Sequence, residues 1–342
     1  MTRRAIVRAD AARVIGSGHI RRCLTLAQRL QDAGWDIAFA TIESSEELVE
    51  DLAEQSVKIV SGDPAHEAEE LRALFPGGVD LLIVDHYQRD AALESACRGW
   101  AQYIMVIDDL VDRPHDADLL VDMTLGRDAD AYRDLLPENT LCLTGTDYAL
   151  LRPEFAEQRP QALARRAQAT SVDEILISVG ATDQSGIMAV LLDGLAQSGF
   201  TGRVSVIGEF SDMDNDYPFD MQMTRQAHNM PARMIAADLA IGACGVTSWE
   251  RCCLGLPTVA VITADNQRDI ASALSQIGAV ELVRETTAQS VSRAVQRLRD
   301  DSEAWLQMSK IAADVCDGAG AERVINTLLP IIEAGEASRS QV

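Results

Sequence analysis

A repeated alternation of short apolar runs with stretches of helical length constrains this chain most. The apolar runs are rich in Val and Ile and show no polar alternation, as in "VDLLIVD" at residues 79–85. Such runs are typical of parallel strands, because helices cover both faces of a parallel sheet. The alternation therefore predicts a doubly wound α/β layer with right-handed crossovers. In the first half of the chain the predicted strands are residues 4–9, 35–41, 57–60, 79–85, 103–108 and 116–122.

The alternation pauses at residues 148–171, which contain two prolines, several arginines and no strand period. We therefore expect a Rossmann-like domain over residues 1–150, a connection over 151–171 and a second Rossmann-like domain over 172–335. The two domains are expected to face each other across a cleft, where the loops that follow the strands bind ligands. In the second domain the predicted strands are residues 173–180, 202–208, 219–224, 238–245 and 257–262, and the closing helices are 286–299, 301–316 and 320–335.

Length and charge limit the classes of partner. The 342 residues suit two domains of about 150 residues each. The chain carries 53 acidic and 30 basic residues, a net charge of −23. Such a surface repels nucleic acid and anionic membranes, so neither is expected as a partner. An anionic ligand must instead be bound locally, by glycine amides and helix N-termini.

The cysteine and histidine patterns contain no familiar metal or disulfide spacing. The seven cysteines form no CxxC pair, which is typical of a reduced, cytoplasmic protein. The five histidines form no HxxxH or HExxH spacing, so we expect no metal and no cofactor. No apolar run approaches 18 residues, and no signal peptide or membrane span is expected. The sequence leaves the oligomeric state open, with a monomer favoured.

The loop after the first strand carries Asp10, Gly16, Gly18 and His19 in "RADAARVIGSGHIRR". Glycines permit a tight turn with positive φ and the close approach of a ligand. His19 then stands at the start of a helix, whose positive end disfavours the imidazolium ion. A neutral imidazole facing a cleft is suited to act as a general base. The alternative is that His19 only caps or packs against the helix.

Further polar side chains follow the fourth and fifth predicted strands. Asp85 and Tyr87 lie in "VDHYQRD", and Asp109 lies in "VIDDL". Carboxylates at neighbouring strand ends could accept hydrogen bonds from sugar hydroxyls or restrain a histidine. They could equally serve as loop solvation or helix N-caps.

The second domain places glycine loops between strands and helices at Gly180 and at Gly245. In "GACGVTSWERCCLGLP", Gly245, Thr247 and Ser248 offer amides and hydroxyls suited to a diphosphate. Glu250, one turn on, could accept hydrogen bonds from a ribose diol. Asn266 and Gln267, after the next strand, can both donate and accept. Ordinary strand-to-helix turns would explain the glycines but not the whole polar set.

Several segments together resemble the hydrolases that act on UDP-2,4-diacetamido-2,4,6-trideoxy-β-L-altropyranose in pseudaminic acid biosynthesis. The resemblance extends over essentially the whole chain, in the same order. The segments that carry it are "RADAARVIGSGHIRRCLTLA", "VDHYQRD", "YALLRPEF", "SWERCCLGLP" and "ADNQ".

This resemblance implies a GT-B fold, with UDP bound mainly by the C-terminal domain and without a metal or cofactor. It implies that His19 activates water, that Asp10 and Tyr87 belong with it in the catalytic group, and that UDP leaves with inversion at the anomeric carbon. The substrate-binding residues are then expected to be Gly16, Gly18, Arg22, Asp85, Asp109, Gly180, Gly245, Thr247, Ser248, Glu250, Asn266 and Gln267.

The chain departs from the family pattern at Ala12, Met123, Thr124, Ala181 and Gly186. These departures allow a UDP-sugar of different stereochemistry or N-acyl pattern. The leading hypothesis is hydrolysis of a UDP-linked diacetamido-trideoxyhexose. The alternatives are a GT-B glycosyltransferase, a hydrolysing 2-epimerase and a non-catalytic nucleotide-sugar binding protein.

Overall fold

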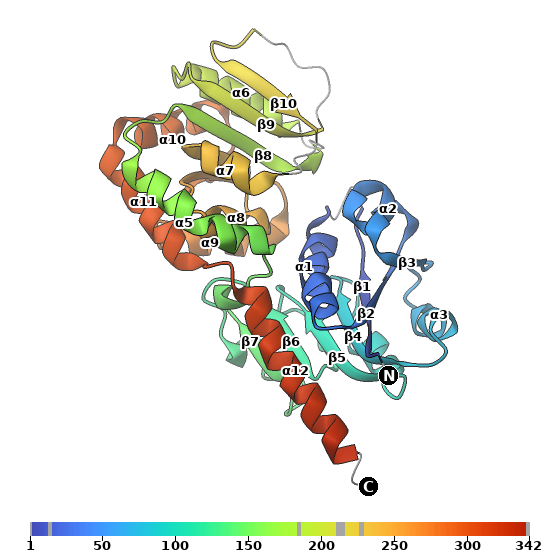
Figure 1. The fold of residues 1–342 in the computed structure, drawn as a ribbon. Coiled ribbons are helices and arrows are strands. Elements are labelled where there is room, and N and C mark those ends of the chain that lie inside the picture. Colours follow the sequence, from blue (N-terminus) through green and yellow to red (C-terminus); the bar gives the residue numbers. More distant parts are fainter. Residues whose placement is uncertain (1, 13–15, 183–185, 210–215, 226–228, 340–342) are drawn as a thin grey trace. The chain divides into compact units, whose positions relative to one another are not determined.

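The computed structural model describes residues 2–12, 16–182, 186–209, 216–225 and 229–339. These residues form two compact units (Figure 1). The first unit comprises Met1–Arg152 and Ala319–Val342, and the second comprises Pro153–Gly318.

The first unit contains one seven-stranded parallel sheet in the order β3-β2-β1-β4-β5-β6-β7. Its strands are β1 (Arg4–Ala9), β2 (Asp36–Thr41), β3 (Ser56–Ile59), β4 (Val79–Asp85), β5 (Ala101–Ile107), β6 (Leu119–Asp122) and β7 (Leu141–Thr144). Its α-helices are α1 (Gly18–Asp32), α2 (Glu43–Leu48), α3 (Glu67–Leu74), α4 (Ala91–Cys97) and α12 (Gly320–Arg339). Short 3₁₀ helices are η1 (Glu50–Glu54), η2 (Ala129–Tyr132) and η3 (Thr146–Tyr148).

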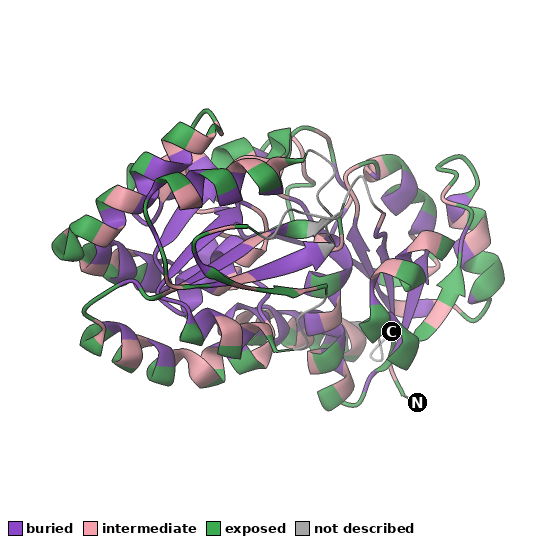
Figure 2. Ribbon diagram, turned by 90° about the horizontal axis from the view of Figure 1, so that it is seen from above, coloured by how far each residue is buried: buried purple, intermediate pink, exposed green. Residues whose placement is uncertain are grey.

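The central strands of this sheet are buried on both faces, as their unbroken apolar sequences predict. Ile6 of β1, Leu82 of β4 and Ile104 of β5 have no exposed surface. Figure 2 shows the same pattern, with buried strands and helices exposed along their outer faces. Helix cover on both faces removes the need for polar alternation, which is why the apolar runs identified the strands.

The strand order reverses between β1 and β4, which are direct neighbours. The chain leaves β1 for α1 and β2 on one side, and it returns to add β4 and β5 on the other. The carboxyl ends of β1, β4 and β5 therefore lie side by side at a topological switch point, where α/β sheets bind ligands.

The second unit contains a six-stranded parallel sheet in the order β10-β9-β8-β11-β12-β13, with its switch point between β8 and β11. Its strands are β8 (Glu174–Thr182), β9 (Arg203–Glu209), β10 (Asp220–Thr224), β11 (Leu239–Ala243), β12 (Thr258–Val261) and β13 (Glu281–Val283). Its helices are α5 (Pro153–Gln168), α6 (Ile187–Gln197), α7 (Met230–Ala236), α8 (Thr247–Cys253), α9 (Arg268–Gln276), α10 (Ala288–Asp300), α11 (Ser302–Val315) and the 3₁₀ helix η4 (Asp265–Gln267).

The unit boundaries differ from those expected in two places. Most of the expected connection is helix α5, which belongs to the second unit despite Pro160 in its interior. The last helix, α12, belongs to the first unit, where it packs against α1 and η3 (Figure 1). The ion pair of Arg3 with Glu336, at 2.8 Å, joins this helix to the start of β1.

The two doubly wound parallel sheets confirm the predicted fold class. Strands β7 and β13 were missing from the prediction, because each is short and has only one buried residue, so neither forms a continuous apolar run. No helix in the described part of the chain is long and apolar enough to cross a membrane.

Candidate functional site

His19 and Asp85 meet at the switch point of the first unit. His19 is the second residue of α1, and Asp85 is the last residue of β4. Nδ1 of His19 lies 2.5 Å from Oδ1 of Asp85, and both side chains are buried. The topology that brings β1 and β4 together thus joins two residues that are 66 positions apart in sequence.

This contact determines which ring nitrogen of His19 carries the proton. Burial alone would raise the pKa of Asp85, but the charge of Arg22 and the contact with His19 outweigh it and hold that pKa far below its usual value. An ionised carboxylate only accepts, so Nδ1 of His19 carries the proton and donates it. The lone pair of the neutral ring is then on Nε2, which has no hydrogen bond to any described residue. An imidazole in this state can accept a proton at Nε2.

Arg22 holds Asp85 from the other side. It stands three residues after His19 on α1, so the two side chains share one helix face. Nε and Nη2 of Arg22 donate to the two oxygens of Asp85, each at 2.6 Å. Its Nη1 donates to Asp109 at 2.9 Å, and the thiol of Cys23 also contacts Asp85, at 3.4 Å. Arg22 and Asp85, both predicted to bind substrate, bind each other in this structure.

Tyr87 packs edge-on against the His19 ring, with 4.4 Å between ring centroids and an interplanar angle of 84°. It follows β4 by two residues, so the strand end that supplies Asp85 also supplies this aromatic wall. His19, Arg22, Asp85, Tyr87 and Asp109 therefore form one cluster, in which every member was predicted as a site residue. We call these five residues the imidazole cluster.

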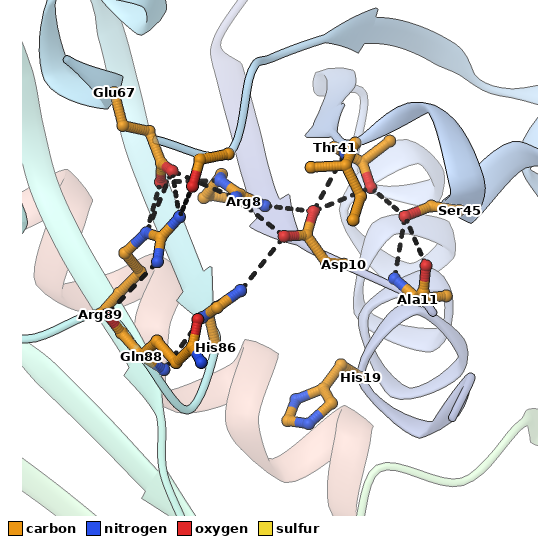
Figure 3. Close-up of polar contacts among 12 residues, drawn as sticks. Arg8, Asp10, Ala11, His19, Thr41, Ser45, Glu67, His86, Gln88 and Arg89 are labelled. Carbon is orange, nitrogen blue, oxygen red and sulfur yellow. Dashed lines mark hydrogen bonds and ion pairs between the residues drawn. The ribbon is translucent and has the colours of Figure 1, made fainter. Parts of the chain in front are cut away.

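Asp10 lies beside this cluster with partners of its own (Figure 3). Arg8 donates to both of its oxygens, at 2.5 and 2.9 Å, and the backbone N–H of Ile42 donates at 3.0 Å. Burial would raise the pKa of Asp10, but hydrogen bonds from His86 and Arg8 lower it well below its usual range. A carboxylate occupied by so many donors is better suited to hold the loop after β1 than to move protons.

His86 completes the contacts of Asp10. Its Nδ1 accepts from the backbone N–H of Gln88 at 3.0 Å, so the proton of the neutral ring is on Nε2. That Nε2 lies 3.1 Å from Oδ2 of Asp10 (Figure 3). Both ring nitrogens are engaged, which distinguishes His86 from His19.

A chain of buried charges extends from Asp10 to α3. Arg8 donates from Nε to the fully buried Glu67 at 2.7 Å, and Arg89 donates to the same carboxylate from the end of β4. Figure 3 shows Glu67 between the two guanidinium groups. This network was not predicted from the sequence. Its sequence signal is Arg8 inside an otherwise apolar strand, since a buried arginine requires an acidic partner.

Gly16, in the loop after β1, has the predicted positive φ, +77°. Its N–H donates to the carbonyl of Ala12 at 2.7 Å. Gly18 has no positive φ and begins α1. Residues 13–15 lie outside the described part of the chain.

Two departures from the family pattern, Met123 and Thr124, are buried just after β6. The neighbouring Asp122 accepts from the Thr124 N–H at 2.8 Å and from the Tyr132 hydroxyl at 2.9 Å. Burial raises the pKa of Asp122.

In the second unit, the side chain of Arg251 binds the loop that was predicted to hold a diphosphate. It donates to the carbonyl of Ala243 at 2.7 Å and to the hydroxyl of Ser248 at 3.2 Å, with Thr247 at 3.4 Å. A Cβ on Gly242 would lie 2.4 Å from its Nη1, so this close approach requires glycine there. Burial lowers the pKa of Arg251, which has no ion pair with a described carboxylate. This cation was not predicted from the sequence, although Arg251 follows Thr247 by four residues and therefore lies on the same face of α8.

The remaining predicted residues of this unit lie near the end of β8 or in the segments that follow β11 and β12. Gly180 adopts φ +126° near the end of β8, and Gly245 precedes α8. Gln267 accepts from the backbone and hydroxyl of Thr263, at 3.0 and 3.1 Å, while Asn266 is exposed in η4. Glu250 is half-buried in α8.

Of two further departures, one lies in β8 and the other follows it. Gly186, with φ +66°, caps α6 in the left-handed region. Ala181 lies in β8. Residues 183–185 lie outside the described residues.

Residues 175–326 match the model of the glycosyltransferase family 28 C-terminal domain. A solved structure of MurG from Acinetobacter baumannii superimposes with a TM-score of 0.68 at 15% identity, covering 95% of this chain and 99% of that one. The chain therefore has the GT-B fold, and most of its second unit matches the family 28 C-terminal domain.

Curated relatives are distant. An uncharacterized protein of Methanocaldococcus jannaschii is 23% identical over 76% of this chain, and the UDP-2,4-diacetamido-2,4,6-trideoxy-beta-L-altropyranose hydrolase of Campylobacter jejuni is 26% identical over 53%. The matches span 56% and 61% of those two proteins. The spore coat polysaccharide biosynthesis protein SpsG of Bacillus subtilis is 23% identical over 95% of this chain and 97% of its own length.

Proposed function

We propose that this protein hydrolyses a UDP-linked 2,4-diacetamido-2,4,6-trideoxyhexose at its anomeric carbon. The observation that carries the proposal is the His19–Asp85 pair, in which the ring proton is held on Nδ1 and Nε2 is left able to accept a proton. The distant likeness to the Campylobacter jejuni hydrolase supports this substrate class.

In the proposed reaction, Nε2 of His19 takes a proton from a water molecule as the water oxygen bonds to the anomeric carbon. The bond from that carbon to the UDP oxygen breaks, and UDP leaves with the bonding electrons. Attack opposite the leaving group inverts the configuration. Asp85 holds the ring through its Nδ1 proton and does not itself take the proton.

Within the imidazole cluster the other members have distinct proposed roles. Tyr87 limits the positions of the ring by edge-on packing. One oxygen of Asp109 binds Arg22, and the other is buried with no hydrogen bond to a described residue, so it is available to a sugar amide or hydroxyl. Asp10 positions the loop after β1.

We place the UDP on the second unit, in keeping with its match to the family 28 C-terminal domain. The guanidinium of Arg251 lies at the first turn of α8 among neutral oxygens, and a buried cation favours an anion nearby. Glu250 is proposed to bind the ribose, and the leaving diphosphate is proposed to need no metal.

The test is UDP release from a panel of UDP-diacetamido-trideoxyhexoses, with a chelator present, by the wild type, His19→Ala and His66→Ala. His66 is an exposed histidine at the start of α3 and serves as the matched control. We expect His19→Ala to lose about 10²–10⁴-fold in turnover while its UDP affinity, measured by calorimetry, stays nearly unchanged. Wild-type turnover in His19→Ala would refute the assignment of the base.

A glycosyltransferase is the second candidate, favoured by the family 28 match itself. The same panel separates the two. UDP bound by the wild type without release from any sugar donor in water would favour a transferase that lacks its acceptor, and would refute hydrolysis.

A further inference from the structure

We infer that Arg22 keeps His19 uncharged, so that the imidazole remains a working base at pH values where an isolated Asp–His pair would already be protonated. Arg22 acts through Asp85 and is a positioning residue. The inference deepens the proposed function, because it rests on His19 being the base.

His19 and Arg22 bind the same oxygen of Asp85. Oδ1 of Asp85 lies 2.5 Å from Nδ1 of His19 and 2.6 Å from Nη2 of Arg22. Nε of Arg22 takes the second oxygen at 2.6 Å. The guanidinium therefore covers both oxygens of Asp85 in a bidentate pair, and His19 is bound to a carboxylate whose charge is already matched.

A carboxylate alone beside an imidazole stabilises the imidazolium ion, since opposite charges attract strongly in a buried site. Here Arg22 opposes that effect twice. It cancels the charge of Asp85, and its own Nη2 lies only 3.3 Å from Nδ1 of His19. A second proton on the ring would place two cations side by side with little solvent between them, because the side chains of Arg22 and His19 are 3% and 7% exposed.

Other titratable groups surround the ring, and Asp109 opposes the effect of Arg22 because it shares the charge of that guanidinium. From α1, Cys23 contacts Asp85, and burial raises the pKa of its thiol. From the end of β4, Tyr87 packs edge-on against the ring. From the end of β5, Asp109 binds the third edge of Arg22. Asp10 and His86, drawn beside His19 in Figure 3, contact each other.

The test is an NMR titration of the ¹⁵N-labelled full-length protein, following the His19 ring nitrogens, which are assigned by their loss in His19→Gln. In the wild type the neutral ring should carry its proton on Nδ1. Arg22→Gln should raise the midpoint of the His19 titration by about one pH unit, a tenfold gain in proton affinity. Arg22→Lys, which keeps a charge but can bind only one oxygen well, should give a smaller rise.

Arg21→Gln is the matched control. It removes the same charge from the next residue of α1, where the side chain is about half exposed and screened by solvent. Its titration should coincide with that of the wild type. A midpoint that stays constant or falls in both Arg22 variants would overturn the inference, and Arg22→Lys keeps the test available if Arg22→Gln does not fold.

Activity then separates this inference from the proposed function. With UDP release as the readout, the acidic limb of kcat/KM should move to higher pH in Arg22→Lys by the shift seen in its titration. If His19→Ala retains turnover, the proposed function fails, whatever the titration shows. If His19→Ala is inactive but the Arg22 variants titrate like the wild type, only the role of Arg22 fails.

Discussion

Asp85 is the residue on which the polar centre of the first unit depends. It is fully buried and accepts hydrogen bonds from His19, Arg22 and Cys23. Such a carboxylate organises its donors only while it stays ionised, and the low pKa set by these donors keeps it so. Catalysis and stability therefore depend on the same side chain.

Replacing Asp85 by Asn should lower the free energy of unfolding by about 3–5 kcal/mol, because Arg22 would lose most of its countercharge in a buried site. Urea denaturation at pH 7 measures the loss. Asp109→Asn is the comparison: it removes one contact of Arg22 at a partly exposed position and should cost only about 1 kcal/mol. If both variants lost the same free energy of unfolding, Asp85 would not be the residue on which this centre depends.

At the scale of elements, α12 depends on a glycine at its first position. A Cβ on Gly320 would lie 2.3 Å from the carbonyl oxygen of Ala149 and 2.5 Å from the carbonyl carbon of Tyr148. Both neighbours are backbone atoms at η3, so they cannot rotate away as a side chain could. The glycine thus allows the helix to approach the first unit closely.

Gly320→Ala should therefore destabilise the first unit by about 1–3 kcal/mol, through displacement of α12 from η3. Hydrogen–deuterium exchange should show the loss of protection in residues 141–151 and 320–332. Gly77→Ala is the control, because a Cβ there meets no atom within 4 Å and φ is not positive. If both variants exchange like the wild type, α12 is not held by this contact.

The sequence predicted elements well where burial alone determined them. The long strands β1, β4 and β8 were found because both of their faces are covered. Helix α5 was interpreted as a connection because Pro160 and its arginines conceal it, although Arg159 and Arg166 bind backbone carbonyls of the second unit. The place of α12 in the first unit depends on tertiary contacts, which periodicity does not report.

The sequence could predict which residues belong to the imidazole cluster, but not which of them bind each other. Strand-end topology placed His19 near Asp85, and the same rule placed Asp109 nearby. The partners within the set depend on the rotation of α1 against β4, which one sequence does not encode locally. Arg22 was therefore expected to bind substrate, and the Arg8–Glu67–Arg89 chain was missed because its members are far apart in sequence.

At the scale of the whole molecule, buried ionised carboxylates are unevenly distributed. Asp10, Glu67 and Asp85 all have lowered pKa values, because hydrogen bonds and charges from their arginine and histidine partners outweigh burial. Among the described residues, the carboxyls with lowered pKa values lie in the first unit. The two units should therefore differ in their response to acid.

A carboxyl whose pKa is lower in the folded state than in the unfolded state stabilises the fold above its unfolded pKa, about 4, and this contribution is lost as the pH falls below it. The first unit should therefore open before the second as the pH drops from 5 toward 2. Pulsed hydrogen–deuterium exchange after incubation at each pH would resolve the two units. Simultaneous opening, or earlier opening of the second unit, would contradict this expectation.

The return of α12 to the first unit has a consequence for how the protein is made. The whole of Pro153–Gly318 is inserted between the last strand of the first unit and the helix that completes it. A ribosome needs roughly ten to thirty seconds to synthesise a segment of this length. During that time Arg3 lacks Glu336, and the surface that α12 covers is open on the nascent chain. The order of synthesis and the order of completion are therefore reversed, and the second unit can finish folding before the first.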